Sequence, residues 1–126
     1  MTKTTVLTNG GEGWVAQRLA GVGALSALSG RYIGWGTGEG TATKSGTSLF
    51  VESDEVRAAG AVTVEGTGSS AKYQVEGTLT SLSSQKITNA GSFSAEEGGT
   101  LIIHMNWDGI DLREDDQITF RFTINP

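Results

Sequence analysis

The sequence predicts an all-β protein: an antiparallel β-sandwich, jelly-roll-like, preceded by a short N-terminal arm. Apolar and polar residues alternate with a period of two in several segments, as in strands that bury one face. Clusters of Gly, Ser, Asn and Asp separate these segments and are typical of turns. Gly, Thr and Ser together make up 47 of the 126 residues, whereas charged residues make up 18%, and this composition favours strands and turns over long surface helices.

The strongest strand predictions cover residues 100–107 and 117–125, and a third strand is expected at 71–80. The side chains of the first that we expect to face inward are Leu101, Ile103, Met105 and Trp107. Those expected to face outward are Thr100, His104 and Asn106. The inward set of the second is Ile118, Phe120, Phe122 and Ile124. The buried face of the third carries Tyr73, Val75 and Leu79.

Four weaker strand predictions complete the set of seven that suggests a β-sandwich. They cover residues 31–35, 48–51, 61–65 and 85–89. A hairpin turn is expected at Glu96-Glu97-Gly98-Gly99, because paired glycines supply the positive φ angles that tight hairpins need.

The first 30 residues differ in charge and in pattern from the rest. Residues 1–30 carry a net charge of +1, so residues 31–126 carry −6, and we divide the chain into an N-terminal arm and a β-sandwich domain at this point. Apolar residues recur every three or four positions from Trp14 to Leu28, which predicts a short amphipathic helix over 14–28. A helix this short must dock on something. It either covers the end of its own domain or reaches a neighbouring subunit, and the sequence leaves both open.

Composition excludes several function classes. The chain has no cysteine, so disulfides, thiolate metal sites and a cysteine nucleophile are excluded. His104 is the single histidine, which excludes multi-histidine metal sites. A net charge of −5 argues against nucleic acid and anionic membranes and favours a protein partner. No targeting signal opens the sequence, and the longest apolar run, 19–28, is shorter than a membrane span.

Candidate chemical motifs have ordinary structural explanations. The segment 38–45 nearly matches a phosphate-binding loop, but Thr43 stands where a glycine belongs and a strand rather than a helix is expected to follow. An acidic stretch is either an exposed turn between two core strands or a cation site, although its spacing matches no EF-hand. Its members are Asp108, Asp111, Glu114, Asp115 and Asp116. The carboxylate pairs at 54–55 and 96–97 are adjacent and point apart, so neither predicts acid/base catalysis.

The aromatic residues and the histidine also admit a binding role. We expect His104 to be exposed or at an interface, because it falls on the outward face of its strand. Trp107 is expected in the core, and Trp35 fits either a core position or an exposed position that stacks on sugars. No enzyme activity, cofactor or resident metal is expected.

Four segments carry a resemblance to a known family. They are RYIGWGTG at 31–38, ITNAGSF at 87–93, GGTL at 98–101 and DQITFRFTI at 116–124. In this order they resemble small virion structural proteins of tailed bacteriophages, over about residues 31–126. The family often has Leu or Ala where Trp35 stands, and residues 52–70 offer no motif.

The resemblance implies a role in the virion and no catalytic residue. Members are similar to capsid decoration (cement) proteins, which bind the outer surface of the major capsid protein lattice, and to modules of tail fibres, tail spikes or baseplates that bind receptors or carbohydrates. The chain has no internal repeat or heptad run for a fibre shaft, so we expect a cement protein, a homotrimer, made in the host cytoplasm. The residues expected to anchor it through the arm are Trp14, Arg18, Leu19, Val22 and Leu25.

Overall fold

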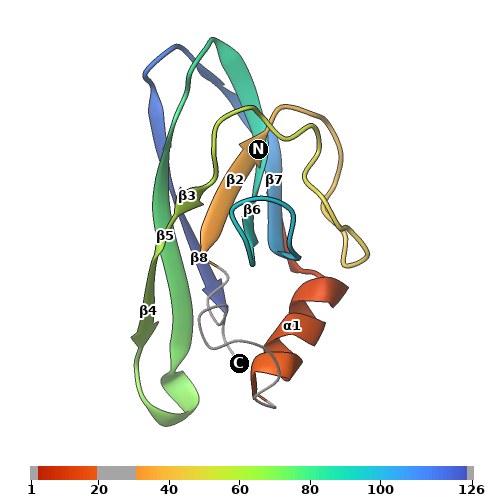
Figure 1. Ribbon diagram of the computed structural model, residues 1–126, viewed down its shortest axis with the longest axis vertical. Helices are drawn as coiled ribbons and strands as arrows, with labels where there is room; N and C mark the ends of the chain where they lie inside the picture. The colour runs from red at the N-terminus through yellow and green to blue at the C-terminus, as the bar shows by residue number, and fades with distance from the viewer. Residues whose placement is uncertain (1–2, 20–30, 125–126) are drawn as a thin grey trace.

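The computed structural model describes residues 3–19 and 31–124, which form two antiparallel sheets and one helix (Figure 1). The larger sheet has the order β1-β7-β6-β2-β3 and the smaller has the order β4-β5-β8. The all-β prediction is therefore confirmed. The elements are β1 (Thr4–Leu7), α1 (Asn9–Leu19), β2 (Tyr32–Gly36), β3 (Ala58–Ala59), β4 (Ala61–Glu65), β5 (Lys72–Thr80), β6 (Gln85–Phe93), β7 (Leu101–Leu112) and β8 (Gln117–Ile124), with a 3₁₀ turn at Gly68–Ser70.

The main core lies between the two sheets. Phe120 of β8 contacts Trp35 of β2 edge-on, with ring centroids 6.3 Å apart, and it also contacts Trp107 of β7 at 5.8 Å. The side chains predicted to face inward on β5 and β8 are buried there or pack against the buried residues. They are Tyr73, Val75, Leu79, Ile118, Phe120, Phe122 and Ile124.

The β6–β7 hairpin has the predicted turn. Gly98 and Gly99 both have positive φ, 63° and 71°, which side chains rarely tolerate. After this turn β7 runs to Leu112, five residues beyond the predicted end at Trp107. Asp108 and Asp111 of the acidic stretch therefore lie in a strand, and the turn itself is formed around Asp115, whose φ is 73°.

A long loop, residues 37–57, covers the outer face of the larger sheet; we call it the covering loop. The strand predicted at 48–51 was wrong, because these residues form no ladder; the one bridge of the covering loop to the sheet, Gly36 to Glu52, comes just after them. Leu49 instead packs in a second apolar cluster with Phe93 and Leu101. Leu101 was predicted to face the main core, but the register of β6 and β7 shifts beside it, after Ser92, and turns it to the outer cluster.

The covering loop approaches the sheet closely because β2 carries glycine on its outer face. A Cβ atom at Gly36 would lie 2.4 Å from the carbonyl oxygen of Phe50. In its absence the two backbones bond directly, with Thr37 N donating to Val51 O at 3.0 Å and Ser53 N donating to Trp35 O at 2.9 Å. The alternating glycines of the 31–38 segment are thus explained by packing.

Part of the predicted arm belongs to the larger sheet. β1 pairs with β7 from Thr4–Asn106 to Leu7–Ile103, and α1 packs against β7. The helix begins at Asn9, five residues before the predicted start, because Thr8 caps it: Thr8 Oγ1 accepts a hydrogen bond from Gly11 N at 2.9 Å. The remaining part of the predicted helix, residues 20–28, lies outside the described residues.

Candidate interaction surface

The outer face of β7 is buried, which corrects the exposure that we expected for His104 and Asn106. His104 is 1% exposed, and its ring packs on Phe50 of the covering loop with centroids 4.7 Å apart. Asn106 Oδ1 accepts a hydrogen bond from Ala42 N at 2.8 Å. Alternation along β7 predicted the face correctly, but it carried no sign of the loop that covers this face.

Asn89 fixes the protonation of His104. Its Oδ1 accepts from Phe50 N at 3.0 Å, and its Nδ2 donates to Phe50 O at 3.0 Å, so the orientation of the amide is determined. His104 Nε2 lies 3.0 Å from the same Oδ1 and must donate to it. The neutral ring therefore carries its proton on Nε2, and burial lowers the pKa of His104. This arrangement holds the covering loop against β6 and β7.

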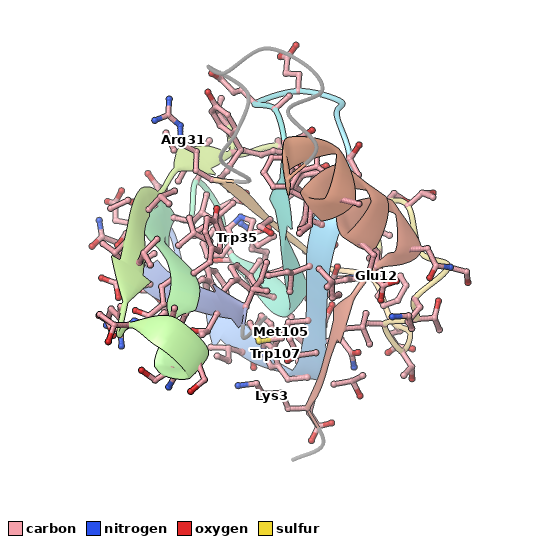
Figure 2. All side chains as sticks on the ribbon, turned by 90° about the horizontal axis from the view of Figure 1, so that it is seen from below. Lys3, Glu12, Arg31, Trp35, Met105 and Trp107 are labelled. Atoms are coloured by element: carbon pink, nitrogen blue, oxygen red, sulfur yellow. The ribbon has the colours of Figure 1, made fainter. Side chains whose placement is uncertain are left out.

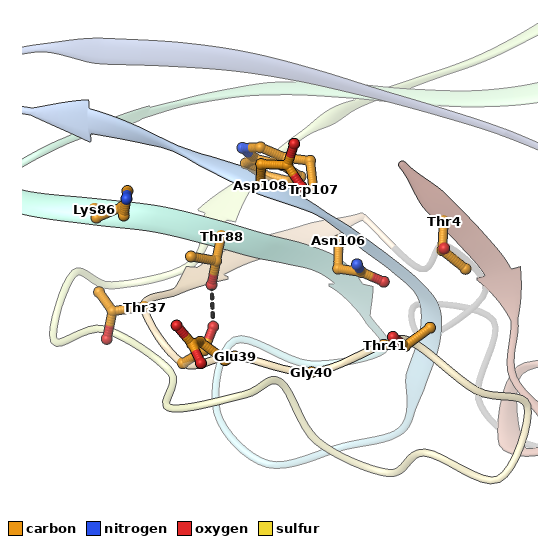
Figure 3. Close-up of a pocket in the computed structure, with 11 residues that line it drawn as sticks. Thr4, Thr37, Glu39, Gly40, Thr41, Lys86, Thr88, Asn106, Trp107 and Asp108 are labelled. Atoms are coloured by element: carbon orange, nitrogen blue, oxygen red, sulfur yellow. Dashed lines mark hydrogen bonds between the residues drawn. The ribbon is translucent and has the colours of Figure 1, made fainter. Parts of the chain in front are cut away.

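A polar hollow of about 410 Å³ lies between the first part of the covering loop and strands β6, β7 and β1 (Figure 3). Its Thr88 hydroxyl donates to Gly38 O, and its Asn106 holds Ala42, so these groups attach the loop. Trp107 also borders the hollow, but its ring packs on Phe120 in the core. Residues 38–41, the first half of the segment that partly resembles a phosphate loop, line this hollow. A helix does not follow the segment in the described part of the chain.

The three tryptophans do not form an exposed ring platform on the described surface. Trp35 is 1% exposed and Trp107 is 8% exposed, and Figure 2 shows both inside the molecule. Trp14 is half-buried and packs against the main core. For Trp14, the helix thus covers its own domain, which is one of the two alternatives left open by the sequence.

The other residues expected to anchor the chain are only partly described. Arg18 and Leu19 lie in the last turn of α1. Val22 and Leu25 lie outside the described residues. Within residues 3–19 and 31–124, no three His, Asp or Glu side chains are placed to hold a metal ion, the acidic stretch included. In the same ranges no helix is long and apolar enough to cross a membrane.

Three exposed aliphatic side chains gather at the end of the molecule where β5 turns into β6, the upper end in Figure 1. Val51 and Val56 come from the covering loop and are 68% and 69% exposed, and Leu82 of the β5–β6 turn is 66% exposed. Val51 and Leu82 border one hollow of about 400 Å³, and Val56 and Leu82 border another of about 320 Å³. We call Val51, Val56 and Leu82 the loop-end surface.

A hydrogen-bond network around Glu55 holds this surface in place. Glu55 Oε1 accepts from Trp35 Nε1 at 2.8 Å, and Glu55 Oε2 accepts from Leu82 N and Gln85 Nε2, each at 2.9 Å. Burial would raise the pKa of Glu55, but these hydrogen bonds together lower it. The network joins the covering loop to β2 and to the β5–β6 turn, so the backbone that carries these aliphatic side chains is held in place by hydrogen bonds.

The surroundings of the loop-end surface are acidic. A neighbouring hollow of about 280 Å³ is lined by Glu52, Asp54, Glu55, Glu96 and Glu97, with one cation, Arg57. Arg57 is already engaged: it pairs with Glu52 at 2.8 Å and lies over the Phe93 ring at 3.4 Å. This surface was not predicted from the sequence, because a valine or leucine in a loop cannot be distinguished by its type alone from one that is buried in the core.

Comparison with known proteins adds no relative: no family model, curated protein or solved structure matches the chain.

Proposed function

We propose that the chain is a structural protein of a tailed-bacteriophage virion, a cement protein that binds the outer surface of the major capsid protein lattice and stabilises the shell. It acts by adding buried contact between neighbouring coat subunits, without chemistry of its own. Because several linked contacts must dissociate together, modest individual affinities combine into a high overall affinity for the shell.

The observation that carries this proposal is where the motifs of the resemblance fall. The segment 31–38 contains β2, 87–93 lies in β6, 98–101 closes the β6–β7 turn, and 116–124 contains β8. β2, β6 and β8 all contribute side chains to the main core, so the likeness covers a large part of the fold rather than one loop. The proposal includes a jelly-roll-like sandwich as the finer description of the fold. This description is supported by the chain changing from one sheet to the other between β5 and β6 and again between β7 and β8.

The proposed contact with the coat has two parts. The first is the N-terminal segment, with Arg18, Leu19, Val22 and Leu25 as contacts. The second is the loop-end surface, whose exposed aliphatic side chains and acidic surroundings suit a coat surface with an apolar patch flanked by Lys or Arg. We include a homotrimer in this proposal, because coat lattices offer three-fold axes.

Copy number and location in purified particles test the function. Quantitative gel analysis of virions with and without tails should give hundreds of copies that stay with tailless heads. A few copies that are lost with the tail would overturn the cement role. That result would favour a tail-fibre, tail-spike or baseplate module that binds a receptor or carbohydrate. The burial of Trp35 and Trp107 argues against these two rings as the sugar-stacking platform of such a module.

Variants separate the two parts of the contact. We expect V22D/L25D and V56D/L82D each to lower binding to heads that lack the protein by tenfold or more, since each places charge in an apolar contact. The matched control is I110D, because Ile110 is also an exposed aliphatic residue, at 42%, and lies in β7 outside both parts. Equal binding by all three variants would contradict the assignment.

A further inference from the structure

Strand β4 is an open edge of the smaller sheet. It pairs with β5 on one side only, and in the described part of the chain no strand lies on its other side, at the lower left in Figure 1. All five of its residues are exposed. An edge strand of this kind presents unpaired N–H and C=O groups and can pair with another strand.

The exposed side chains of β4 include two valines on one face. Val62 stands opposite Val75 of β5, and Val64 stands opposite Tyr73, so both valines share the core-facing side of the sheet. Yet Val62 is 37% exposed and Val64 is 72% exposed, and neither belongs to the core cluster. The core face of the sheet therefore continues as uncovered apolar surface at this edge.

The sequence of β4, AVTVE, is compatible with itself in antiparallel pairing. A two-fold axis at Thr63 places Val62 opposite Val64 of the second copy, and Ala61 opposite Glu65. This register keeps the valines of both copies on one face, because paired positions in antiparallel strands share a face. The one charged residue, Glu65, meets alanine, so no like charges are opposed.

The other strand edges are less suited to such pairing. β3 has two residues, and β1 has four and follows Lys3. β8 has eight residues but carries Arg121 in its middle, paired with Glu76 at 2.7 Å. Charges and short length are the usual protection of edges. The one charge of β4, Glu65, lies at the end of the strand, and β4 has no Lys, no Pro and no bulge.

We propose that β4 is a self-association strand: it pairs antiparallel with β4 of a second copy about a two-fold axis at Thr63 and joins two three-stranded sheets into one of six. Because the contact is isologous, it uses each β4 once and closes at a pair. The contact is independent of the capsid role, and a homotrimer would use another surface, so that β4 would link one trimer to the next.

Single cysteines test the register, because the chain has no native thiol. Directly opposite Cα atoms in an antiparallel pair lie about 4.5–5.5 Å apart, within disulfide range. T63C should therefore form a cross-linked dimer under mild oxidation with diamide. A61C alone should not, since its two copies would be offset by four residues, roughly 13 Å. A mixture of A61C and E65C should cross-link again.

A charge on the apolar face tests the association itself. We expect V64K to weaken dimer formation at least tenfold in sedimentation velocity, while I110K, at another exposed aliphatic position, leaves it unchanged. Circular dichroism should show both variants folded, because both side chains are exposed. A protein that is monomeric up to 100-fold the working concentration, or T63C that cross-links no faster than A61C, would overturn the proposal. Neither result would bear on binding to heads, so the capsid role stands or falls separately.

Discussion

The imidazole of His104 couples stability to pH. Asn89 Oδ1 accepts a hydrogen bond from His104 Nε2, and burial lowers the pKa of His104 below the ordinary value of 6.5. Below pH 6.5 the unfolded chain binds a proton on this ring that the folded chain does not bind. The unfolded state is therefore favoured progressively as the pH falls from 6.5 toward the folded-state pKa, and the stability is fully present above 6.5.

We expect the free energy of unfolding to decrease between pH 7 and pH 5, by at most about 1.4 kcal/mol per pH unit, the limit for one proton. Denaturant titration at several pH values measures it. H104Q keeps an N–H donor for Asn89 and does not titrate, so its stability should change much less across this range. The same decline in both proteins would contradict the role of His104.

At the scale of elements, the covering loop depends on the absence of a side chain at Gly36. A methyl group there would lie 2.4 Å from Phe50 O and 2.7 Å from Val51 O, both backbone atoms that cannot rotate away. We expect G36A to lower the free energy of unfolding by at least about 2 kcal/mol. G13A is the matched control: Gly13 lies in α1 with nothing within 4 Å of its Cβ position, so alanine should stabilise by up to about 1 kcal/mol. G36A as stable as the native chain would show that the loop is held elsewhere.

Elements with strict alternation were predictable, and those set by tertiary contacts were not. β5 and β8 were predicted within a residue of their ends, because each buries one face against the core and exposes the other. The helix start was missed since Gly10, Gly11 and Gly13 lower helix propensity, although Thr8 as a possible N-cap and an acidic residue, Glu12, in the first turn were usable signals. Gly11 is needed because its Cβ would meet Ile102 O at 2.4 Å.

The candidate surface was missed for a related reason. Periodicity reports which face a side chain is on, but not whether a distant segment covers that face. His104 is thus buried by Phe50, which lies more than fifty residues earlier in the chain, while Val56 and Leu82 stay exposed in polar surroundings. One signal was available: alternating glycines at 34, 36 and 38 mark a strand on which another backbone lies directly.

At the scale of the whole molecule, the N-terminal segment closes an edge of the larger sheet. β1 pairs with the backbone N–H and C=O groups of β7 on the edge that faces away from β6. Thr8 is fully buried, and its N–H donates to Ile102 O at 2.9 Å. α1 then covers part of β7, and Trp14 and Leu7 add to the main core. Removal of residues 1–30 should therefore affect the stability of the β-sandwich domain.

We expect a chain that starts at Arg31 to melt at least about 10 °C below the full chain. It loses strand β1, the helix that covers part of β7, and the core contacts of Leu7 and Trp14. The loss of β1 also leaves an edge of β7 free to pair with other chains. Thermal unfolding followed by circular dichroism measures this, and light scattering detects the added association. V22D/L25D in the full chain is the control, because it keeps β1 and α1. A truncated chain with the native melting temperature would instead support a boundary at residue 30 and a detachable arm. Loss of capsid binding by the truncated chain therefore does not locate the contact, because the truncation also opens this edge of β7. Full-chain variants such as V22D/L25D, which keep β1 and α1, test the contact itself.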